Sequence, residues 1–587
     1  MFLPNMKSFG ALSVDLPIHK GMVTARPCMK GELSLTENLS SRLYPYLSTR
    51  LPRGIKRRGE KLLSLCQGDG LCCLTEGALE YGGREFALPM ELYGRELLPF
   101  GGDVLILPQG GGSGACGIFR RGAEEVELWN KPINLSGPVE ILWCTREGEI
   151  LQRIHPSTQA PEDRSLLWLD LREEKPCVRL WSVIEDGWAV TEDAFLMLRS
   201  EGIGEKLEKG LCFSLDNATD PWLYRDGNCK TVLASGEDYV IFQGVMRVER
   251  VDEASLQLRL FPTLPKLDHW ILHGNRLWGC RYGEDVNGKF VNCIYASKLG
   301  RPDLWYALDG LSSDSYFVNV GEPGAFTGVG VVGDCPVFFK ENCLIRISGN
   351  RPGNFRTKTI PCSGVRQGCG GTVVNMDGSL LYLGRDGLCL YDGSEPLLLG
   401  QQVELGELRN VVAGAFGKFY YLSCGESFGE LNLLVYDLEH GLWHGETGPS
   451  VKKFCSVGGE LYFYGEDDVL YSVSPRGCRE REKNFSWKLE SSILSVLQQE
   501  GNCLQSLNLS FATDKWENPA QISQLWVEQQ DPLGSALYMG QVHGKGQEAV
   551  SLPLQNPHPG YPQVLKLYGM GELAFRNIAV SYHKEGS

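Results

Sequence analysis

The chain has 587 residues, a formal net charge of −15 at pH 7 and a hydrophobic content of 42%. This length is enough for about three to four domains at one domain per ~150 residues. The hydrophobic content excludes a globally disordered chain, and the acidic balance excludes a protein that binds polyanions over its whole surface. No stretch approaches the ~18 consecutive apolar residues of a membrane helix, so we expect no membrane insertion.

Residues 1–57 are predicted to form an extended N-terminal arm. The start of this arm contains Pro4, Asp15 and Pro17 and lacks the apolar central region of a secretory signal peptide. We therefore expect that the protein is not secreted by means of such a peptide.

A dense run of cations begins near the end of the arm, with Glu60 as the only acidic residue among them. One interpretation is a solvated surface loop, which charge runs usually form. Another is contact with phosphate, because closely spaced cations displace condensed counterions from nucleic acid; a nuclear localisation signal also matches the letters. The candidate contacts to nucleic acid or to a neighbouring subunit are Arg50, Arg53, Lys56, Arg57, Arg58 and Lys61.

A short pattern then recurs along the chain: a turn containing glycine, one or two variable residues, and the start of an apolar and aromatic strand. If one aromatic residue per unit is taken as equivalent, the steps are 60, 44, 39 and 41 residues. A repeat of ~40–50 residues made of strands and turns is typical of a β-propeller blade, a four-stranded sheet that buries its faces against its neighbours. We therefore predict an all-β propeller of about six to eight blades. The aromatic positions are Trp278, Phe338, Tyr382, Tyr421 and Tyr462.

The same pattern occurs upstream in residues 68–72 and 102–106 but is absent from the long segment that follows. We predict that this segment is a β domain inserted into the propeller, and the alternative is that further divergent blades fill it. Strands are expected inside it at 139–143, 166–171, 178–183 and 195–198.

The pattern also stops after Cys478, where short strands continue between Gly, Pro and Asn turns, as in a β-sandwich. The predicted domains are therefore the arm at 1–57, the first blades at 58–135, the inserted β domain at 136–262, the remaining blades at 263–480 and a C-terminal β-sandwich at 481–587.

The twenty cysteines are scattered, and several fall within predicted strands. We interpret them as small buried hydrophobic residues in a reducing compartment, and not as a disulfide framework. No Cys-x-x-Cys pair occurs, and no histidine lies near Cys362 and Cys369, so we expect no zinc site.

Catalytic motifs are scarce. Gly328, Gly330 and Gly333 match the letters of a dinucleotide-binding fingerprint, but a predicted strand follows them where a helix is needed, so we interpret them as turn glycines. His440 and His444 would bring two metal ligands together on a helix, but their flanks predict a hairpin. Because no nucleophile elbow or phosphate loop is present either, we expect no catalytic residue, no cofactor, no metal and no enzymatic activity.

Two segments carry a resemblance to a known family: residues 274–280, Gly-Asn-Arg-Leu-Trp-Gly-Cys, and residues 292–305, which end in Gly-Arg-Pro-Asp-Leu-Trp. They resemble a family of uncharacterised phage and prophage structural proteins. The N-terminal segment 38–53 resembles the corresponding part of two propeller proteins of phage head–tail junctions, the tail nozzle (tail tubular protein B) and the packaged-DNA stabilisation protein. The other residues that carry the resemblance are Asp314-Ser315-Tyr316, Phe326-Thr327-Gly328 and Phe338-Phe339-Lys340-Glu341-Asn342.

This resemblance implies a non-enzymatic virion protein that is assembled in the cytoplasm of a bacterial host. By analogy with nozzle proteins, the implied partners are further copies in a hexameric ring, other head–tail or tail proteins, and packaged DNA in non-specific contact. The alternative is a tail-tip propeller that binds or cleaves glycans of the host surface. A solvent-lined cluster of arginine and acidic residues at the centre of the ring would favour that alternative.

Overall fold

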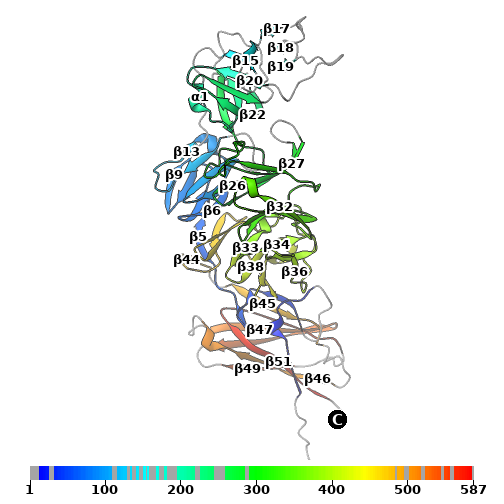
Figure 1. Ribbon diagram of the computed structural model, residues 1–587. Coiled ribbons are helices and arrows are strands. Elements are labelled where there is room, and N and C mark those ends of the chain that lie inside the picture. Colours follow the sequence, from blue (N-terminus) through cyan, green and yellow to red (C-terminus); the bar gives the residue numbers. More distant parts are fainter. Residues whose placement is uncertain are drawn as a thin grey trace, which may run out of the picture. The chain divides into compact units, whose positions relative to one another are not determined.

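The computed structural model describes residues 12–24, 32–108, 115–128, 133–134, 140–144, 150–153, 155–157, 167–170, 177–180, 195–217, 225–243, 258–284, 290–476, 478–482, 485–494, 502–516, 522–543, 548–554 and 561–584. Nearly all of its elements are β-strands (Figure 1). The chain divides into two compact units, which are residues 61–365 and the combination of residues 1–60 with 366–587.

The unit of residues 61–365 contains four antiparallel sheets of four strands, each with its strands in chain order. The first sheet is β6 (Ser64–Gly68), β7 (Gly70–Leu74), β8 (Ala78–Tyr81) and β9 (Arg84–Ala87); the second is β10 (Arg95–Phe100), β11 (Asp103–Pro108), β12 (Gly117–Phe119) and β13 (Glu127–Leu128). The third is β25 (His269–His273), β26 (Arg276–Glu284), β27 (Phe290–Ala296) and β28 (Tyr316–Asn319); the fourth is β29 (Gly328–Val332), β30 (Cys335–Lys340), β31 (Cys343–Ser348) and β32 (Arg356–Pro361).

Between the second and third of these sheets, the chain forms a different structure. An eight-stranded sheet runs in the order β14 (Ile133–Asn134), β24 (Leu258–Thr263), β21 (Cys212–Asn217), β22 (Arg225–Ser235), β23 (Tyr239–Gln243), β20 (Phe195–Arg199), β15 (Glu140–Cys144) and β16 (Ile150–Arg153). It is accompanied by α1 (Ile203–Lys206) and by a sheet of β17 (His155–Ser157), β18 (Leu167–Asp170) and β19 (Cys177–Leu180). The strands predicted from the sequence overlap β15, β18, β19 and β20, and the described part of this segment is an inserted sheet, not a series of four-stranded blades.

The other unit holds three more antiparallel groups of four strands; the second group is part of a nine-stranded sheet, and the third is extended by a fifth strand. They are β33 (Val374–Met376), β34 (Ser379–Gly384), β35 (Gly387–Tyr391) and β36 (Leu397–Leu399); β37 (Ala413–Phe416), β38 (Phe419–Phe428), β39 (Leu431–Asp437) and β40 (Leu442–Glu446); and β41 (Val451–Val457), β42 (Glu460–Gly465), β43 (Val469–Ser472) and β5 (Gly54–Arg58). The described residues therefore form seven blades, and the predicted all-β propeller with an inserted β domain is confirmed.

The fourth strand of the last blade comes from the N-terminal part of the chain. Strand β5 pairs antiparallel with β43, with Arg57 opposite Leu470, and also pairs with the short strand β44 (Glu480–Arg481). An N-terminal strand in the last blade is a way for a propeller to bring the two ends of its repeat sequence together without exposing an edge.

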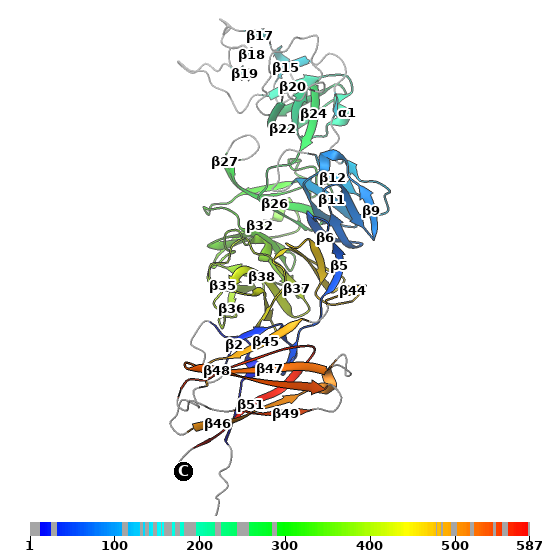
Figure 2. The same ribbon diagram turned by 180° about the vertical axis from the view of Figure 1, so that it is seen from behind.

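The remaining strands of this unit form a β-sandwich. One sheet runs β3 (Leu39–Leu43), β4 (Tyr46–Thr49), β51 (Ala574–Lys584), β46 (Asn502–Phe511) and β49 (Ala549–Pro553), with β1 (Leu12–Asp15) paired to β51; the facing sheet contains β2 (Leu33–Glu37), β45 (Ser486–Ser491), β50 (Val564–Met570), β47 (Ile522–Asp531) and β48 (Gly534–His543). In Figure 2, β2 lies beside β45 and β47 beside β48, and β50 pairs between β45 and β47. The core between the sheets includes Trp487, Leu507 and Phe575, all fully buried.

The prediction of a separate N-terminal arm over residues 1–57 is wrong. Strands β1 to β4 belong to the sandwich, and β5 belongs to the last blade. The reason is burial: Leu33, Leu39 and Leu47 lie in the sandwich core with side chains from the C-terminal strands. The sandwich predicted from residues 481–587 alone is therefore completed by the other end of the chain.

The five repeat aromatics all lie on the second strand of their blades, but they do not occupy one equivalent position. Counted from the first residue after the hairpin turn, Trp278, Tyr421 and Tyr462 lie two residues along, whereas Phe338 and Tyr382 lie three along. Because successive side chains of a strand point to opposite faces, the two groups face different neighbours. Trp278 packs in one cluster with Phe338, and Tyr421 packs in another with Phe463 of the next blade.

The second strand therefore supplies both sides of the packing between blades, and its buried rings should be important for stability. We predict that Tyr382→Ala lowers the free energy of unfolding by about 3–5 kcal/mol, because it removes a fully buried ring and leaves a cavity. Phe317→Ala, at a ring that is 45% exposed, is the control and should cost much less. Urea denaturation followed by tryptophan fluorescence measures both, and equal losses would contradict the assigned packing.

Candidate functional site

The structure places the two leading arginines of the cationic run in the interior. Arg50 and Arg53 are 5% and 3% exposed. The Arg50 guanidinium donates two hydrogen bonds to the Glu482 carboxylate, at 2.7 and 2.9 Å, and the Arg53 guanidinium donates one to Glu446 at 2.8 Å. Arg50 also lies over the ring of Phe485, 4.0 Å from its centroid. Both positive charges are therefore neutralised within the fold.

The electrostatic balance of this cluster follows from burial and pairing. Burial would raise the pKa of the Glu482 carboxyl, but the hydrogen bonds and charge of Arg50 outweigh it and hold that pKa below its ordinary value. Burial lowers the pKa of Arg50, assisted by repulsion from Arg53, while for Arg53 the attraction of Glu446 and Glu482 exceeds the effect of burial and raises its pKa. Arginine stays protonated in either case, so the cluster pairs two positive guanidinium groups with two carboxylates.

The other four cations of the run lie on or beside β5. Arg57 is paired with Glu60, and the exposed Arg58 donates hydrogen bonds to Glu480, one of them at 2.6 Å. Lys56 and Lys61 are exposed. The expectation that all six cations contact nucleic acid or a neighbouring subunit is wrong for Arg50 and Arg53, because their side chains are buried against carboxylates. For Lys56, Arg57, Arg58 and Lys61 it remains a prediction.

A small pocket lies beside the buried network. Its volume is about 40 Å³, which is room for about three water molecules and far below the ~300–1,000 Å³ of typical small-molecule sites. Its wall is mainly aromatic and aliphatic, with the Arg50 guanidinium and the Glu446 carboxylate on one side. The lining residues are Ser40, Arg42, Arg50, Leu51, Phe416, Phe419, Tyr421, Glu446 and Val473.

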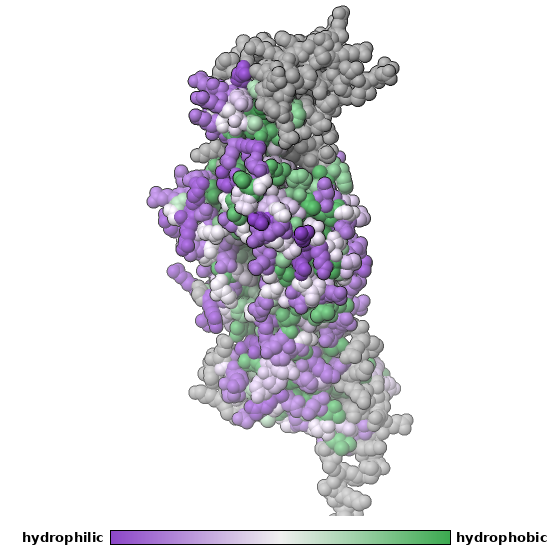
Figure 3. Space-filling model, viewed as in Figure 1, coloured by the Kyte–Doolittle hydropathy of each residue, from purple (hydrophilic) through white to green (hydrophobic). Residues whose placement is uncertain are grey.

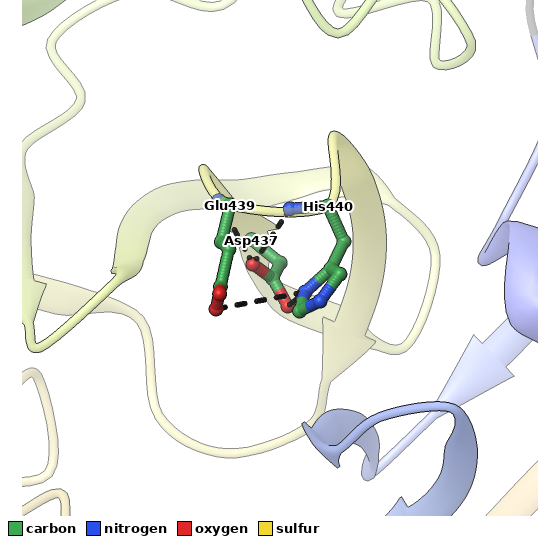
Figure 4. Close-up of side chains that lie close together, drawn as sticks. All are labelled: Asp437, Glu439 and His440. Atoms are coloured by element: carbon green, nitrogen blue, oxygen red, sulfur yellow. Dashed lines mark hydrogen bonds and ion pairs between the residues drawn. The ribbon is translucent and has the colours of Figure 1, made fainter.

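A second group of titratable side chains lies in the turn between β39 and β40. Figure 4 shows the side chains of Asp437, Glu439 and His440 directed toward one another, and their potential ligand atoms lie within 4.8 Å of one another. However, the Lys418 ammonium lies 2.7 Å from Glu439, 3.1 Å from His440 and 3.4 Å from Asp437. A lysine cation thus already fills the position that a metal ion would need.

The same cluster is tied to the N-terminal strands. The Ser41 hydroxyl donates a 2.6 Å hydrogen bond to Asp437, and the Tyr44 ring stacks on His440 with centroids 3.9 Å apart. Burial would raise the pKa of Asp437, but the hydrogen bonds from Ser41 and His440 and the charge of Lys418 lower it. The group therefore holds the blade to β3 and its turn, which is a structural role.

His444 does not join this cluster. It lies on β40, and the predicted hairpin geometry of the two histidines is confirmed by the β39–β40 pairing. Its imidazole is 2% exposed, with Nδ1 3.4 Å from the Thr36 hydroxyl, and burial lowers its pKa to about 4.

Of the three fingerprint glycines, Gly328 and Gly330 lie in β29 and Gly333 in the following turn, so only Gly333 is a turn glycine.

On the face shown in Figure 3, hydrophilic residues cover most of the described surface, and hydrophobic residues appear in small groups between them. In the described part of the chain, no helix has the length and hydropathy needed to cross a membrane.

The comparisons with known proteins bear on the fold alone. No protein-family model matches the chain, and no curated protein matches its sequence. Among solved structures, PorZ, a surface component of the type-IX secretion system of Porphyromonas gingivalis, is 10% identical with a TM-score of 0.24 and coverage of 84% of this chain and 77% of PorZ. BamB from Moraxella catarrhalis is 10% identical with a TM-score of 0.34, covering 74% of this chain and 99% of BamB. An exo-β-1,3-galactanase from Phanerochaete chrysosporium is 11% identical with a TM-score of 0.20, covering 53% of this chain and 95% of the enzyme.

We predict that the buried network is needed for stability. Arg53→Met should lower the free energy of unfolding by about 3–5 kcal/mol, because it leaves the Glu446 carboxylate buried without its closest partner. Arg58→Met removes a cation of the same segment from an exposed ion pair and should change stability little. Chemical denaturation of the two variants makes the comparison, and a similar loss in both would contradict the assigned roles.

His444 predicts a specific dependence of stability on pH. The unfolded chain binds a proton at this residue near pH 6.5, whereas the folded chain does so only near pH 4. Because the unfolded state binds more protons between these values, stability should fall by up to about 3 kcal/mol as the pH drops from 6.5 to 4. His444→Gln should remove that part of the decline in pH-dependent unfolding measurements, and an unchanged decline in this variant would contradict the assignment.

Proposed function

We propose that the protein is a non-enzymatic structural subunit of a phage or prophage virion, at the tail or head–tail junction and of the nozzle or DNA-stabilisation type. The observation that carries the proposal is one nine-stranded sheet, β37-β38-β39-β40-β2-β45-β50-β47-β48. It joins a propeller blade to the sandwich by strand pairing, with Glu37 of β2 opposite Gly445 of β40. Bending at this joint would break main-chain hydrogen bonds, so the blade and the sandwich form one stiff part, which suits a subunit that must resist mechanical force.

The segment that resembles head–tail junction proteins, residues 38–53, lies at this joint. The Asn38 amide donates hydrogen bonds to the Thr447 hydroxyl at 2.7 Å, next to the blade, and to the Ser486 carbonyl at 2.8 Å, in the sandwich. The Arg50 guanidinium in turn donates a 2.8 Å bond to the Asn38 side-chain oxygen. These residues therefore connect the blade to the sandwich, and this connecting function supports the proposal that the protein is a structural subunit.

The charge clusters support the same proposal. Among the described residues, two groups of acidic and basic side chains are each neutralised internally, one by Arg50 and Arg53 and the other by Lys418. A general acid or base needs a proton-accepting group that faces a substrate-sized space, and the pocket beside the first group, of about 40 Å³, is far smaller than that.

The test is to find the protein in particles. A prophage or phage that encodes the chain with an affinity tag should yield purified virions that contain it at a fixed copy number, with labelling at the tail or head–tail junction. Asn38→Ala should reduce its incorporation, while Asn577→Ala, which removes an exposed hydrogen bond to Asp15, should not. Complete virions without the protein would overturn the proposal.

The absence of enzymatic activity is predicted separately. Purified protein incubated with host cell-wall and capsular glycans should release no reducing ends, because neither charge cluster offers an ionisable group beside a space large enough for a sugar ring. A propeller glycosidase serves as the positive control. Catalytic release of sugar by this protein would replace the structural proposal with the tail-tip glycosidase.

We propose that the four remaining cations of the run, Lys56, Arg57, Arg58 and Lys61, face packaged DNA or a neighbouring subunit of a homo-oligomeric ring. The double variant Arg57→Glu with Arg58→Glu should reduce DNA retention in particles. For each phosphate that is no longer neutralised, the log–log salt dependence of DNA binding should become flatter by roughly 0.9. The matched control is Arg120→Glu with Arg121→Glu, an adjacent exposed pair that is also ion-paired. Full genomes and unchanged infectivity in the first variant would show that these cations are only solvated.

A further inference from the structure

Two cysteines of the first blade lie directly opposite each other. Cys66 on β6 and Cys72 on β7 are register partners in the hairpin that turns at Gly68 and Gly70. They are 5% and 0% exposed and pack in the same hydrophobic cluster. Both are thiols, not joined in a disulfide, and they are hydrogen-bonded to each other.

This register suits a covalent bond between the two sulfur atoms. Directly opposed residues of an antiparallel pair have Cα atoms about 4.5 or 5.5 Å apart, depending on the type of pair, and their side chains project from the same face. A disulfide needs a Cα separation of roughly 4.4–6.8 Å. Either type of pair therefore meets the requirement without a change in strand register. Cys73, the next residue of β7, pairs with Leu65 and points to the opposite face.

We propose that Cys66 and Cys72 are a disulfide-forming pair that is oxidised reversibly by exchange with a small disulfide such as oxidised glutathione, and that the bond locks the first hairpin of the first blade. This inference goes beyond the proposed function and does not depend on it.

The exchange has two steps. The hydrogen bond from Cys66 lowers the pKa of the Cys72 thiol, against the opposing effect of burial, so Cys72 is the attacking thiolate. It attacks one sulfur of the small disulfide, forms a mixed disulfide and releases one glutathione thiolate. Cys66 then loses its proton and attacks the Cys72 sulfur, which releases the second thiolate. The two protein thiols give up two electrons and two protons in all, and the two glutathione molecules leave as thiols.

Two other buried cysteines lack this activation. Burial raises the pKa of Cys116 and of Cys424 to about 12, which keeps them as thiols with little nucleophilic character at neutral pH. The Cys72 sulfur packs against Gly68, where an added Cβ would lie 2.7 Å from that sulfur and 2.8 Å from the Tyr81 ring. The exchange therefore requires a local opening at the tip of the hairpin, which lies only two residues from each thiol. The oxidation should therefore be selective.

The experiment compares full-length protein before and after incubation in a glutathione buffer of rising oxidised fraction. Remaining thiols are alkylated under unfolding conditions, and the protein is digested and mapped by mass spectrometry. We expect a 66–72 cross-linked peptide in wild type, reversal by dithiothreitol, and full alkylation of Cys116 and Cys424. Cys73→Ala is the matched control and should keep the cross-link. Cys66→Ser, whose hydroxyl can still donate a hydrogen bond to the Cys72 sulfur, should stop at a glutathione adduct on Cys72, and Cys72→Ala should form neither product.

The proposal is overturned if Cys66 and Cys72 of wild type stay as alkylatable as in the untreated protein, or if either one is found cross-linked to a different cysteine. The wild-type peptide map decides this even if a variant fails to fold. As a second readout, the oxidised protein should unfold at a higher temperature than the reduced protein, and dithiothreitol should abolish the difference. An unchanged midpoint with the cross-link present would show that the bond forms but does not lock the hairpin.

Discussion

The unit that contains both chain ends depends on the hydrogen bonds of one buried asparagine. Asn38 is fully buried and adopts a left-handed backbone with φ of 54°, a conformation that asparagine tolerates better than most residues. Its amide bonds to Thr447 and Ser486, its side-chain oxygen accepts from Arg50, and its main-chain N–H bonds to Gly445. Blade, sandwich and N-terminal strands therefore meet at one residue, and the Arg50–Glu482 pair is oriented from there.

The charges of the molecule divide between surface and interior in a way that the net value of −15 does not reveal. The buried arginines and the turn lysine are each matched by nearby carboxylates, so burial is compensated by pairing and hydrogen bonding. Such pairs add little net stability over apolar residues of the same size but are costly to break singly. They also fix partners: Arg50 has a unique set of acceptors in Asn38, Leu51 and Glu482, and this specificity defines how the N-terminal strands dock.

The sequence was most informative where the signal is local. Turn glycines such as Gly274 and Gly458, both with positive φ, mark the hairpins of the blades, and the spacing of these turns predicted the propeller. The one-residue shift at Phe338 and Tyr382 escaped detection because both faces of these strands are buried, so no polar alternation marks the register. The strand partners of β2 and β5 lie at the other end of the chain and leave no local pattern. The carboxylates that cover Arg50 and Arg53 also lie far away in the sequence. The local sequence of the cationic run therefore could not show which of its six cations are buried.

The strand that completes the last blade also constrains how the protein folds as it is made. Strand β5 emerges early from the ribosome, but its partner β43 is synthesised about 400 residues later, which at ~5–20 residues per second is a delay of about 20–80 s. During that time β5 has no partner from its own blade, and its positive charges oppose pairing with strands of other chains. Closure of the last blade is thus a late, non-local step, of the kind that slows folding. The positive charges of residues 50–61 would then protect the nascent chain from pairing with other chains, before these residues take up their positions in the folded protein.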